Sequence, residues 1–174
     1  MSSILLSEER IQARVRELGA AISATYRDKQ PFLMVGVLRG AAPFFADLLR
    51  SITVPVSIDF MSISSYTTPA PSSGAVRIIK DLDHPIAGKH VLLVEDIIDT
   101  GLTLRYIRKN LLLRHPSSLG VCVLLDRPKR RLVEMSIDHV GFEIPDEYVV
   151  GYGLDHRQLY RNLPFVTLWD HSEE

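Results

Sequence analysis

The chain has 174 residues, of which 46% are apolar and 24% are charged, so its length and composition suit one globular domain with a single core. Its 20 basic and 21 acidic side chains give a formal net charge of −1, which argues against sequence-independent binding to nucleic acid. The only cysteine, Cys122, excludes an internal disulfide and fits the reducing cytoplasm, while charged residues 8–10 follow the apolar residues 4–6 too closely for a signal peptide or a membrane span.

Alternating helices and strands are predicted from the start of the chain. Apolar side chains recur at helical spacing between residues 7 and 28, and Pro31 ends this predicted helix. Residues 32–38 form a continuous apolar run that is too short for a buried helix, which predicts a strand covered on both faces. Pro43 then stands in the first turn of a second predicted helix over residues 41–50.

The next segment combines strand-like and loop-like sequence. Residues 54–61 alternate between apolar and polar side chains, which predicts a strand. Residues 64–74 carry no charge and almost no apolar bulk, and residues 77–82 return to a strand-like pattern. The segment 64–74 is therefore either a simple solvated connection or the tip of a long hairpin that closes as a lid.

Two further buried strands are predicted, over residues 91–94 and 119–125, with a helix between them. Strands that alternate with helices indicate an α/β fold with a mainly parallel central sheet flanked by helices. In such a fold the ligand site lies at the carboxyl ends of the strands. The loops after Leu38, Val94 and Leu125 are therefore expected to face one another.

A cluster of acids and hydroxyl side chains follows the strand 91–94; its members are Glu95, Asp96, Asp99, Thr100, Gly101 and Thr103. The free amides at the start of the next helix, together with the two threonine hydroxyls, suit a phosphate. Glu95 and Asp96 suit hydroxyl groups or a hard cation such as Mg²⁺. A sugar phosphate offers both kinds of group. Helix capping alone would explain one of these side chains but not the whole cluster.

Other nucleotide and metal motifs are missing from the sequence. There is no G-x-x-x-x-G-K-[ST], and no G-x-G-x-x-G follows a strand, which disfavours an ordinary P-loop nucleotide hydrolase. The six histidines show no zinc-binding pattern, and one cysteine cannot build a thiolate metal site.

Residues 91–104, Val-Leu-Leu-Val-Glu-Asp-Ile-Ile-Asp-Thr-Gly-Leu-Thr-Leu, resemble the phosphoribosyl-pyrophosphate signature of type I phosphoribosyltransferases, specifically of their hypoxanthine-guanine branch. The resemblance covers nearly the whole chain. Residues 37–40 resemble the pyrophosphate loop of that family, and Ser65-Tyr66 the start of its mobile lid. Residues 140–155 resemble its purine-binding hood and, with residues 160–164, separate this branch from relatives that use orotate, adenine or uracil.

The resemblance implies the type I phosphoribosyltransferase fold, with a mainly parallel sheet, a small hood and a hairpin lid. It implies a single domain over residues 1–174, whose hood is formed mainly by about 127–174 with part of the N-terminus. It also implies a homodimer or homotetramer. Exposed apolar segments around the second predicted helix are candidates for the interface.

The implied reaction transfers the 5-phosphoribosyl group of phosphoribosyl pyrophosphate to N9 of hypoxanthine or guanine, with Mg²⁺, in purine salvage. The implied phosphoribosyl-pyrophosphate site comprises Glu95, Asp96, Asp99, Thr100, Gly101, Leu102 and Thr103. The implied pyrophosphate contacts are Arg39, Gly40 and Arg161. The implied purine contacts are Arg127, Tyr148, Val149 and Asp155, and the implied metal ligands are Glu95, Asp96 and Asp155.

By the same resemblance, Asp99 lies near N7 of the purine as a general base or hydrogen-bond acceptor, and Tyr148 stacks on the base. Arg127 stands where the family usually has a lysine that contacts the exocyclic oxygen of the base. Its planar fork leaves the preference among hypoxanthine, guanine and xanthine open. Lys129 is a less favoured substitute for that lysine. By sequence alone, the basic run of Arg127, Lys129, Arg130 and Arg131 could also be a basic turn or a partner patch.

Two alternative functions follow from these features. The chain could be a transferase that prefers another base, such as xanthine. It could also be a regulatory module that senses phosphoribosyl pyrophosphate without catalysis, and that contacts RNA. The near-neutral charge and the complete set of implied site residues favour the enzyme.

Overall fold

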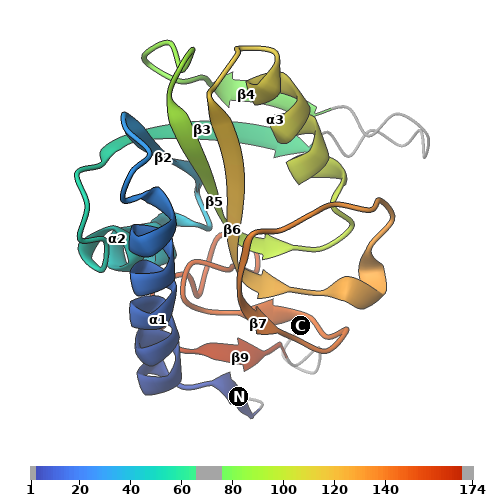
Figure 1. Ribbon diagram of the computed structural model, residues 1–174. Helices are drawn as coiled ribbons and strands as arrows, with labels where there is room; N and C mark the ends of the chain where they lie inside the picture. Colours follow the sequence, from blue (N-terminus) through green and yellow to red (C-terminus); the bar gives the residue numbers. More distant parts are fainter. Residues whose placement is uncertain (1–2, 66–75, 170–174) are drawn as a thin grey trace.

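The computed structural model describes residues 3–65 and 76–169. Its central sheet has six strands in the order β4-β3-β2-β5-β6-β7 (Figure 1). These strands are β2 (Phe32–Leu38), β3 (Ser57–Ser65), β4 (Val76–Lys80), β5 (His90–Ile98), β6 (Ser118–Asp126) and β7 (His139–Glu143). Every neighbouring pair is parallel except β3 and β4, which are antiparallel. The predicted α/β fold with a mainly parallel sheet is confirmed.

Helices cover both faces of this sheet (Figure 1). Helices α1 (Glu8–Tyr26) and α2 (Ala42–Arg50) pack on one face, and α3 (Leu102–Leu112) packs on the other. Successive strand residues therefore enter different cores: Met34 of β2 packs with α1 and α2, whereas Val35 packs with α3. Burial on both faces explains why the predicted strands are continuous apolar runs. Within the described residues, no helix has both the length and the apolar character needed to cross a membrane.

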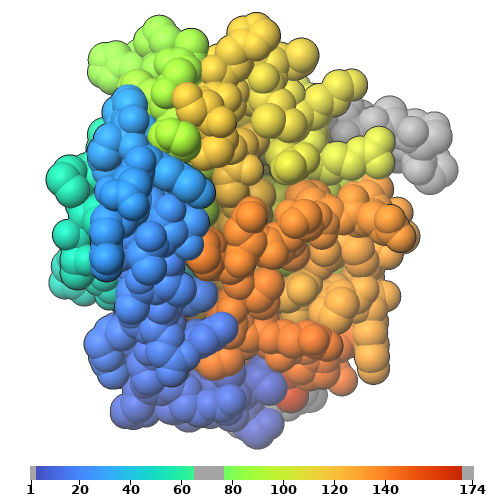
Figure 2. Space-filling model, viewed as in Figure 1, coloured from blue at the N-terminus to red at the C-terminus, as the bar shows by residue number. Residues whose placement is uncertain are grey.

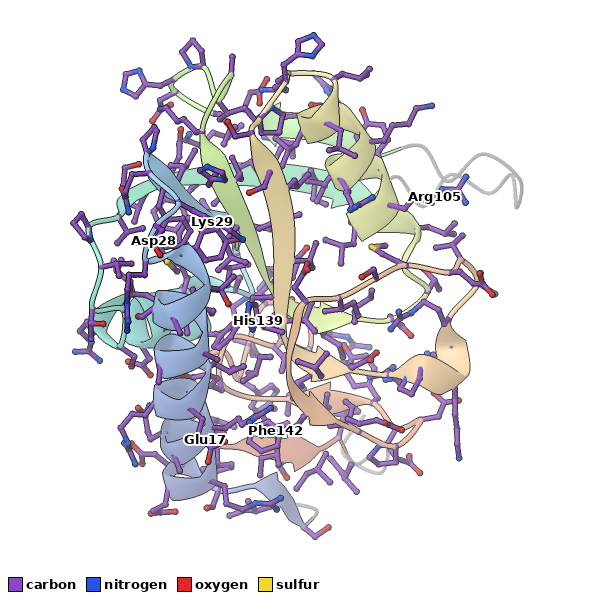
Figure 3. The ribbon with its side chains drawn as sticks, in the orientation of Figure 1. Glu17, Asp28, Lys29, Arg105, His139 and Phe142 are labelled. Atoms are coloured by element: carbon purple, nitrogen blue, oxygen red, sulfur yellow. The ribbon has the colours of Figure 1, made fainter. Side chains whose placement is uncertain are left out.

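Helix α1 is tied to the edge strand β7. The Arg14 guanidinium donates to the backbone oxygens of Gly141 and Val140 at 2.9 and 2.8 Å. Figure 3 shows the side chains of His139 and Phe142 on β7 beside this helix. In the space-filling view, the blue α1 segment and the orange C-terminal segment adjoin on one face of the molecule (Figure 2). Two segments that are far apart in sequence are thereby fixed against each other.

A second, three-stranded sheet joins the two ends of the chain at one end of the molecule. Its antiparallel order is β1-β9-β8, formed by β1 (Ile4–Leu6), β9 (Val166–Leu168) and β8 (Val149–Val150). A single 3₁₀ turn, η1 (Pro128–Arg130), follows β6. These elements lie in the parts of the chain to which the family resemblance assigns the hood.

Two predicted strand boundaries were wrong. Strand β5 does not end at Val94, because its pairing with β6 continues to the pair Ile98 and Asp126. Glu95 and Asp96 therefore belong to a strand and not to a loop. Strand β3 begins at Ser57, two residues after Pro55, which has no N–H group to donate to a ladder.

The predicted exposed apolar surface around the second helix was also wrong. Phe44, Phe45 and Leu48 of α2 are buried in the core with α1. Of the exposed large apolar side chains, several lie together on α3 and just after it, at Leu102, Tyr106, Leu112 and Leu113. Of the predicted lid residues, Ser65 ends β3, and Tyr66 lies outside the described residues.

The close approach of α1 to β6 predicts a specific effect on stability. A Cβ added at Gly120 would lie 2.6 Å from the Tyr26 hydroxyl, which bonds to the Val91 oxygen at 3.4 Å. Gly120→Ala should lower the free energy of unfolding by about 1–3 kcal/mol through overpacking. Tyr26→Phe should cost about 1 kcal/mol. Because the phenylalanine makes room for the new methyl group, urea unfolding of the double variant should show a smaller loss than the sum, and strictly additive losses would contradict this contact.

Candidate active site

The carboxyl ends of β2, β5 and β6 meet, as the alternating pattern predicts. Gly40 follows β2, and a Cβ added to it would lie 1.7 Å from the Asp96 Oδ2 atom on β5. Arg127 follows β6, and its Nη1 atom lies 3.7 Å from Asp99 Oδ2. The three loops therefore surround one site, and Gly40 is required because any side chain there would displace the Asp96 carboxylate.

Two adjoining pockets occupy this site. The larger, of about 250 Å³, is lined by Asp96, Ile97, Asp99, Arg127, Arg130, Tyr148, Val149, Leu154 and Asp155. The smaller, of about 150 Å³, is lined by Glu95, Ile97, Ile98, Asp99, Thr100, Gly101, Thr103 and Leu104. Ile97 and Asp99 line both pockets. Asp99 therefore stands at the junction between an anion-binding loop and a pocket with an aromatic wall.

The smaller pocket is built by the turn that begins α3. Gly101 is the residue before the helix and has a φ of 80°, a conformation that side-chain-bearing residues rarely adopt. Gly101 has no side chain with which to cap this helix end, and the Leu102 amide donates to the Thr100 hydroxyl oxygen at 3.3 Å. The positive end of the helix dipole and the hydroxyl of Thr103 face the same pocket. This arrangement suits a phosphate group.

The buried Glu95 and the half-buried Asp96 lie next to each other near the carboxyl end of β5. Burial, together with the neighbouring Asp96 charge, raises the pKa of Glu95 well above its usual range. Burial also raises the pKa of Asp96, although its carboxylate accepts a 2.7 Å hydrogen bond from the Ile97 amide. Two adjacent acids that resist ionisation together provide a place for a cation or for hydroxyl donors. Across residues 3–65 and 76–169, no three His, Cys, Asp or Glu side chains gather to hold a metal by themselves.

Asp99 has a different environment from this pair. Its Oδ2 atom lies 3.7 Å from a guanidinium nitrogen of Arg127 and 3.9 Å from one of Arg130. Its Oδ1 atom is buried and makes no hydrogen bond. A buried acceptor oxygen without a partner is costly, so this atom is available to a donor group on a ligand.

Sequence reasoning missed a set of contacts between the loop after β6 and residues 99–103, the loop before and at the start of α3, here called the phosphate loop. Arg131 Nε donates to the Asp99 backbone oxygen at 3.1 Å, and its guanidinium pairs with Asp126. The Leu132 backbone amide donates to the Thr100 backbone oxygen at 3.0 Å. Arg131 therefore holds the phosphate loop in place. The basic run 127–131 was its only signal in the sequence, and that run does not reveal which residue turns inward.

Residues 148–155 contribute the aromatic wall of the larger pocket. Tyr148 is 42% exposed, and its hydroxyl donates to the Asp155 backbone oxygen at 2.8 Å. Val149, in β8, is buried beside it. The Asp155 carboxylate forms a 2.7 Å ion pair with Arg161. The structure thus brings these predicted purine-site residues together.

The predicted pyrophosphate residues also lie close together. Arg161 donates to the Gly153 oxygen at 2.6 Å, and its guanidinium shares an acceptor with that of Arg39, the Gln158 amide oxygen. Gln158 was not a predicted site residue, and a single polar residue in a loop gives no signal in a sequence. Lys129, in contrast, is exposed and does not line either pocket.

Comparisons with known proteins agree with this geometry. The model of the phosphoribosyl transferase domain family matches residues 1–157. A hypoxanthine phosphoribosyltransferase of Haemophilus influenzae is 54% identical over 165 residues, which cover 94% of this chain and 92% of that protein. A hypoxanthine-guanine phosphoribosyltransferase of Bacillus subtilis is 48% identical over 166 residues, which cover 95% of this chain and 92% of that protein.

A solved structure supports the same assignment. The crystal structure of a hypoxanthine phosphoribosyltransferase from Staphylococcus aureus superposes with a TM-score of 0.94 at 47% sequence identity. The match covers 98% of this chain and 92% of that chain. The fold, the two adjoining pockets and the extent of these matches lead to one conclusion: the chain belongs to the phosphoribosyltransferase family.

Proposed function

We propose that the protein transfers the 5-phosphoribosyl group of phosphoribosyl pyrophosphate to N9 of hypoxanthine or guanine, giving IMP or GMP and pyrophosphate in purine salvage. The observation that carries this proposal is the junction of the two pockets at Asp99. A nucleotide that spans both pockets has its phosphate on the α3 turn and its base against Tyr148. The names of the most similar relatives support the same substrate class.

The phosphate loop and the carboxylate pair bind different parts of the sugar phosphate. The loop from Thr100 to Thr103 binds the 5-phosphate, and Glu95 with Asp96 binds the ribose hydroxyls. Mg²⁺ fits the same acids, since it commonly takes one or two carboxylates and completes its shell with substrate oxygens and water. Glu95 and Asp96 would hold one ion and Asp155 a second, and when bound these ions would offset negative charge on the pyrophosphate.

The reaction forms a bond between N9 of the base and C1 of the ribose while the bond from C1 to the pyrophosphate oxygen breaks. Positive charge builds up on the sugar and negative charge on the leaving group. Arg39 and Arg161 stabilise the leaving group, because fixed donors act strongly at a partly desolvated site. Asp99 accepts a proton or a hydrogen bond at N7 of the base through its unpartnered Oδ1 atom.

Base recognition depends on Tyr148, Val149 and Arg127. The Tyr148 ring stacks on the purine, and the Val149 backbone meets its edge. Arg127 is 4% exposed, and its Nε atom makes no hydrogen bond, so this guanidinium has a donor available for the 6-oxo group. A guanidinium offers more donors than the usual lysine, which makes xanthine the alternative substrate.

We also propose that residues 1–174 act as one domain in the cytoplasm, as a homodimer or homotetramer. The hood comprises about 127–174 with part of the N-terminus, and the hairpin that includes Ser65 and Tyr66 is the lid. The buried single cysteine, whose pKa is raised by burial, is in keeping with a reducing compartment.

Nucleotide formation from phosphoribosyl pyrophosphate and Mg²⁺ tests the proposed function, with hypoxanthine, guanine, xanthine and adenine as parallel bases. Turnover should occur with hypoxanthine or guanine and not with adenine, which lacks the 6-oxo group. Arg127→Lys should shift the ratio of hypoxanthine to xanthine turnover by about tenfold or more, because it changes the donors at that group. Failure of all four bases to react would refute the proposal, and tight phosphoribosyl-pyrophosphate binding without turnover would favour the sensor.

Asp99→Asn tests the role of the junction residue. Loss of the acceptor charge should lower kcat on the order of 100-fold, while the KM for phosphoribosyl pyrophosphate should change little. Steady-state kinetics measures both. Asp83→Asn is the matched control, because Asp83 is exposed, pairs with Lys80 of β4 and lines neither pocket. Equal turnover in the Asp99 variant would remove this residue from the mechanism.

Glu95→Gln tests the buried acid pair through the pH dependence of stability. Because the folded-state pKa of Glu95 is raised, the ligand-free protein loses stability as pH rises from the ordinary carboxyl range through that raised value. The free energy of unfolding of the variant should therefore exceed that of the unsubstituted protein by on the order of 1–3 kcal/mol at pH 8. Near pH 4 the variant should show no such gain. Urea unfolding at both pH values measures the difference.

The exposed Glu134→Gln is the control for this experiment and should leave stability unchanged at both pH values. Mg²⁺ and phosphoribosyl pyrophosphate together should stabilise the unsubstituted protein more than the Glu95 variant. A Glu95 variant no more stable at pH 8 than the unsubstituted protein would show that burial of this acid carries no cost.

A further inference from the structure

Gln158 joins two arginines of the proposed pyrophosphate site. Its amide oxygen accepts a hydrogen bond from Arg39 Nη1 at 3.2 Å and another from Arg161 Nη2 at 3.1 Å. Arg39 is exposed and follows β2 of the central sheet, whereas Gln158 and Arg161 belong to the segment between β8 and β9. One neutral oxygen is thus the point at which two guanidinium groups from distant segments converge.

The charges around this oxygen are not balanced. Arg161 forms an ion pair with Asp155 at 2.7 Å, but Arg39 forms none with an acid in the described part of the chain. The Gln158 amide oxygen offers Arg39 a partial negative charge only. A phosphate oxygen at the same point would form charge-assisted hydrogen bonds with both arginines, which are stronger than those to a neutral amide.

The backbone of this segment fixes Gln158 in a tight turn, because His156 and Leu159 pair as an antiparallel bridge around Arg157 and Gln158. Gln158 has a φ of 69°, and its neighbours Arg157 and Tyr160 have φ values of 51° and 73°. All three are left-handed conformations that residues with side chains adopt at a cost. The backbone N–H of Gln158 donates to Asp155 Oδ2 at 2.8 Å, which fixes the backbone of this residue. Positive φ at both central residues is the usual geometry of a two-residue hairpin turn, so the turn determines where the Gln158 side chain lies.

We propose that Gln158 is an internal competitor for the pyrophosphate site: in the ligand-free protein its side-chain amide oxygen occupies the place that an oxygen of the pyrophosphate group takes on binding. The Gln158 side chain is displaced from the two arginines when the ligand arrives. This inference rests on the proposed function, because it takes the two arginines as the pyrophosphate contacts. Binding of pyrophosphate then competes with an internal acceptor, whereas binding of the purine does not.

Substitutions of Gln158 separate an internal competitor from a direct ligand contact. Gln158→Glu places a full negative charge between the arginines in nearly the same shape, and it should raise the Kd for inorganic pyrophosphate about tenfold or more. Gln158→Ala removes the competitor, so pyrophosphate should bind as tightly as to the unsubstituted protein or more tightly. Calorimetric titration with pyrophosphate and Mg²⁺ measures both. The KM for phosphoribosyl pyrophosphate should follow the same order, with the KM for the base unchanged.

Leu159→Glu is the matched control, because it adds the same charge to the same segment at a side chain that is 62% exposed. It should bind pyrophosphate like the unsubstituted protein. Wild-type affinity in the Gln158→Glu variant, or weaker binding in the Gln158→Ala variant, would overturn the inference and leave the proposed function standing. If the unsubstituted protein does not bind pyrophosphate, both fail.

Discussion

The burial of two adjacent acids at the end of β5 is the constraint on which the site depends. Pairing with β6 continues to Ile98, so the chain cannot leave the sheet before it has placed Glu95 and Asp96 beside each other. Burial raises the pKa of both acids, and a site of this kind costs the ligand-free protein stability. Such a cost is characteristic of functional sites, where a cation or ligand donors restore the balance.

The two pockets, which we propose hold the sugar phosphate and the base, share their walls. Ile97 and Asp99 line both pockets, and Arg127 and Arg131 contact the same loop from the side of the base. Arg127 reaches the Asp99 carboxylate, while Arg131 holds its backbone oxygen. A change in the segment 127–131 is therefore expected to affect both base preference and the geometry of the phosphate loop, which makes this segment more than a basic turn.

The sequence predicted the strands and helices of the core because burial on both faces leaves continuous apolar runs, as in β2. It misplaced Glu95 and Asp96 in a loop, because polar residues rarely continue a buried strand. It overestimated exposure around α2, since the helix packs its apolar side against α1. The sequence did not predict the contacts of Arg131 and Gln158, because their partners lie on other segments and only the fold brings them together.

A crystal structure with bound GMP tests the central claim most directly, namely that one ligand spans both pockets across Asp99. The account predicts the phosphate on the amides and hydroxyls of residues 100–103, the base stacked on Tyr148, and N7 within hydrogen-bonding distance of Asp99. The ribose hydroxyls should face Glu95 and Asp96. A nucleotide bound elsewhere, or with its phosphate in the larger pocket and its base on the α3 turn, would contradict it.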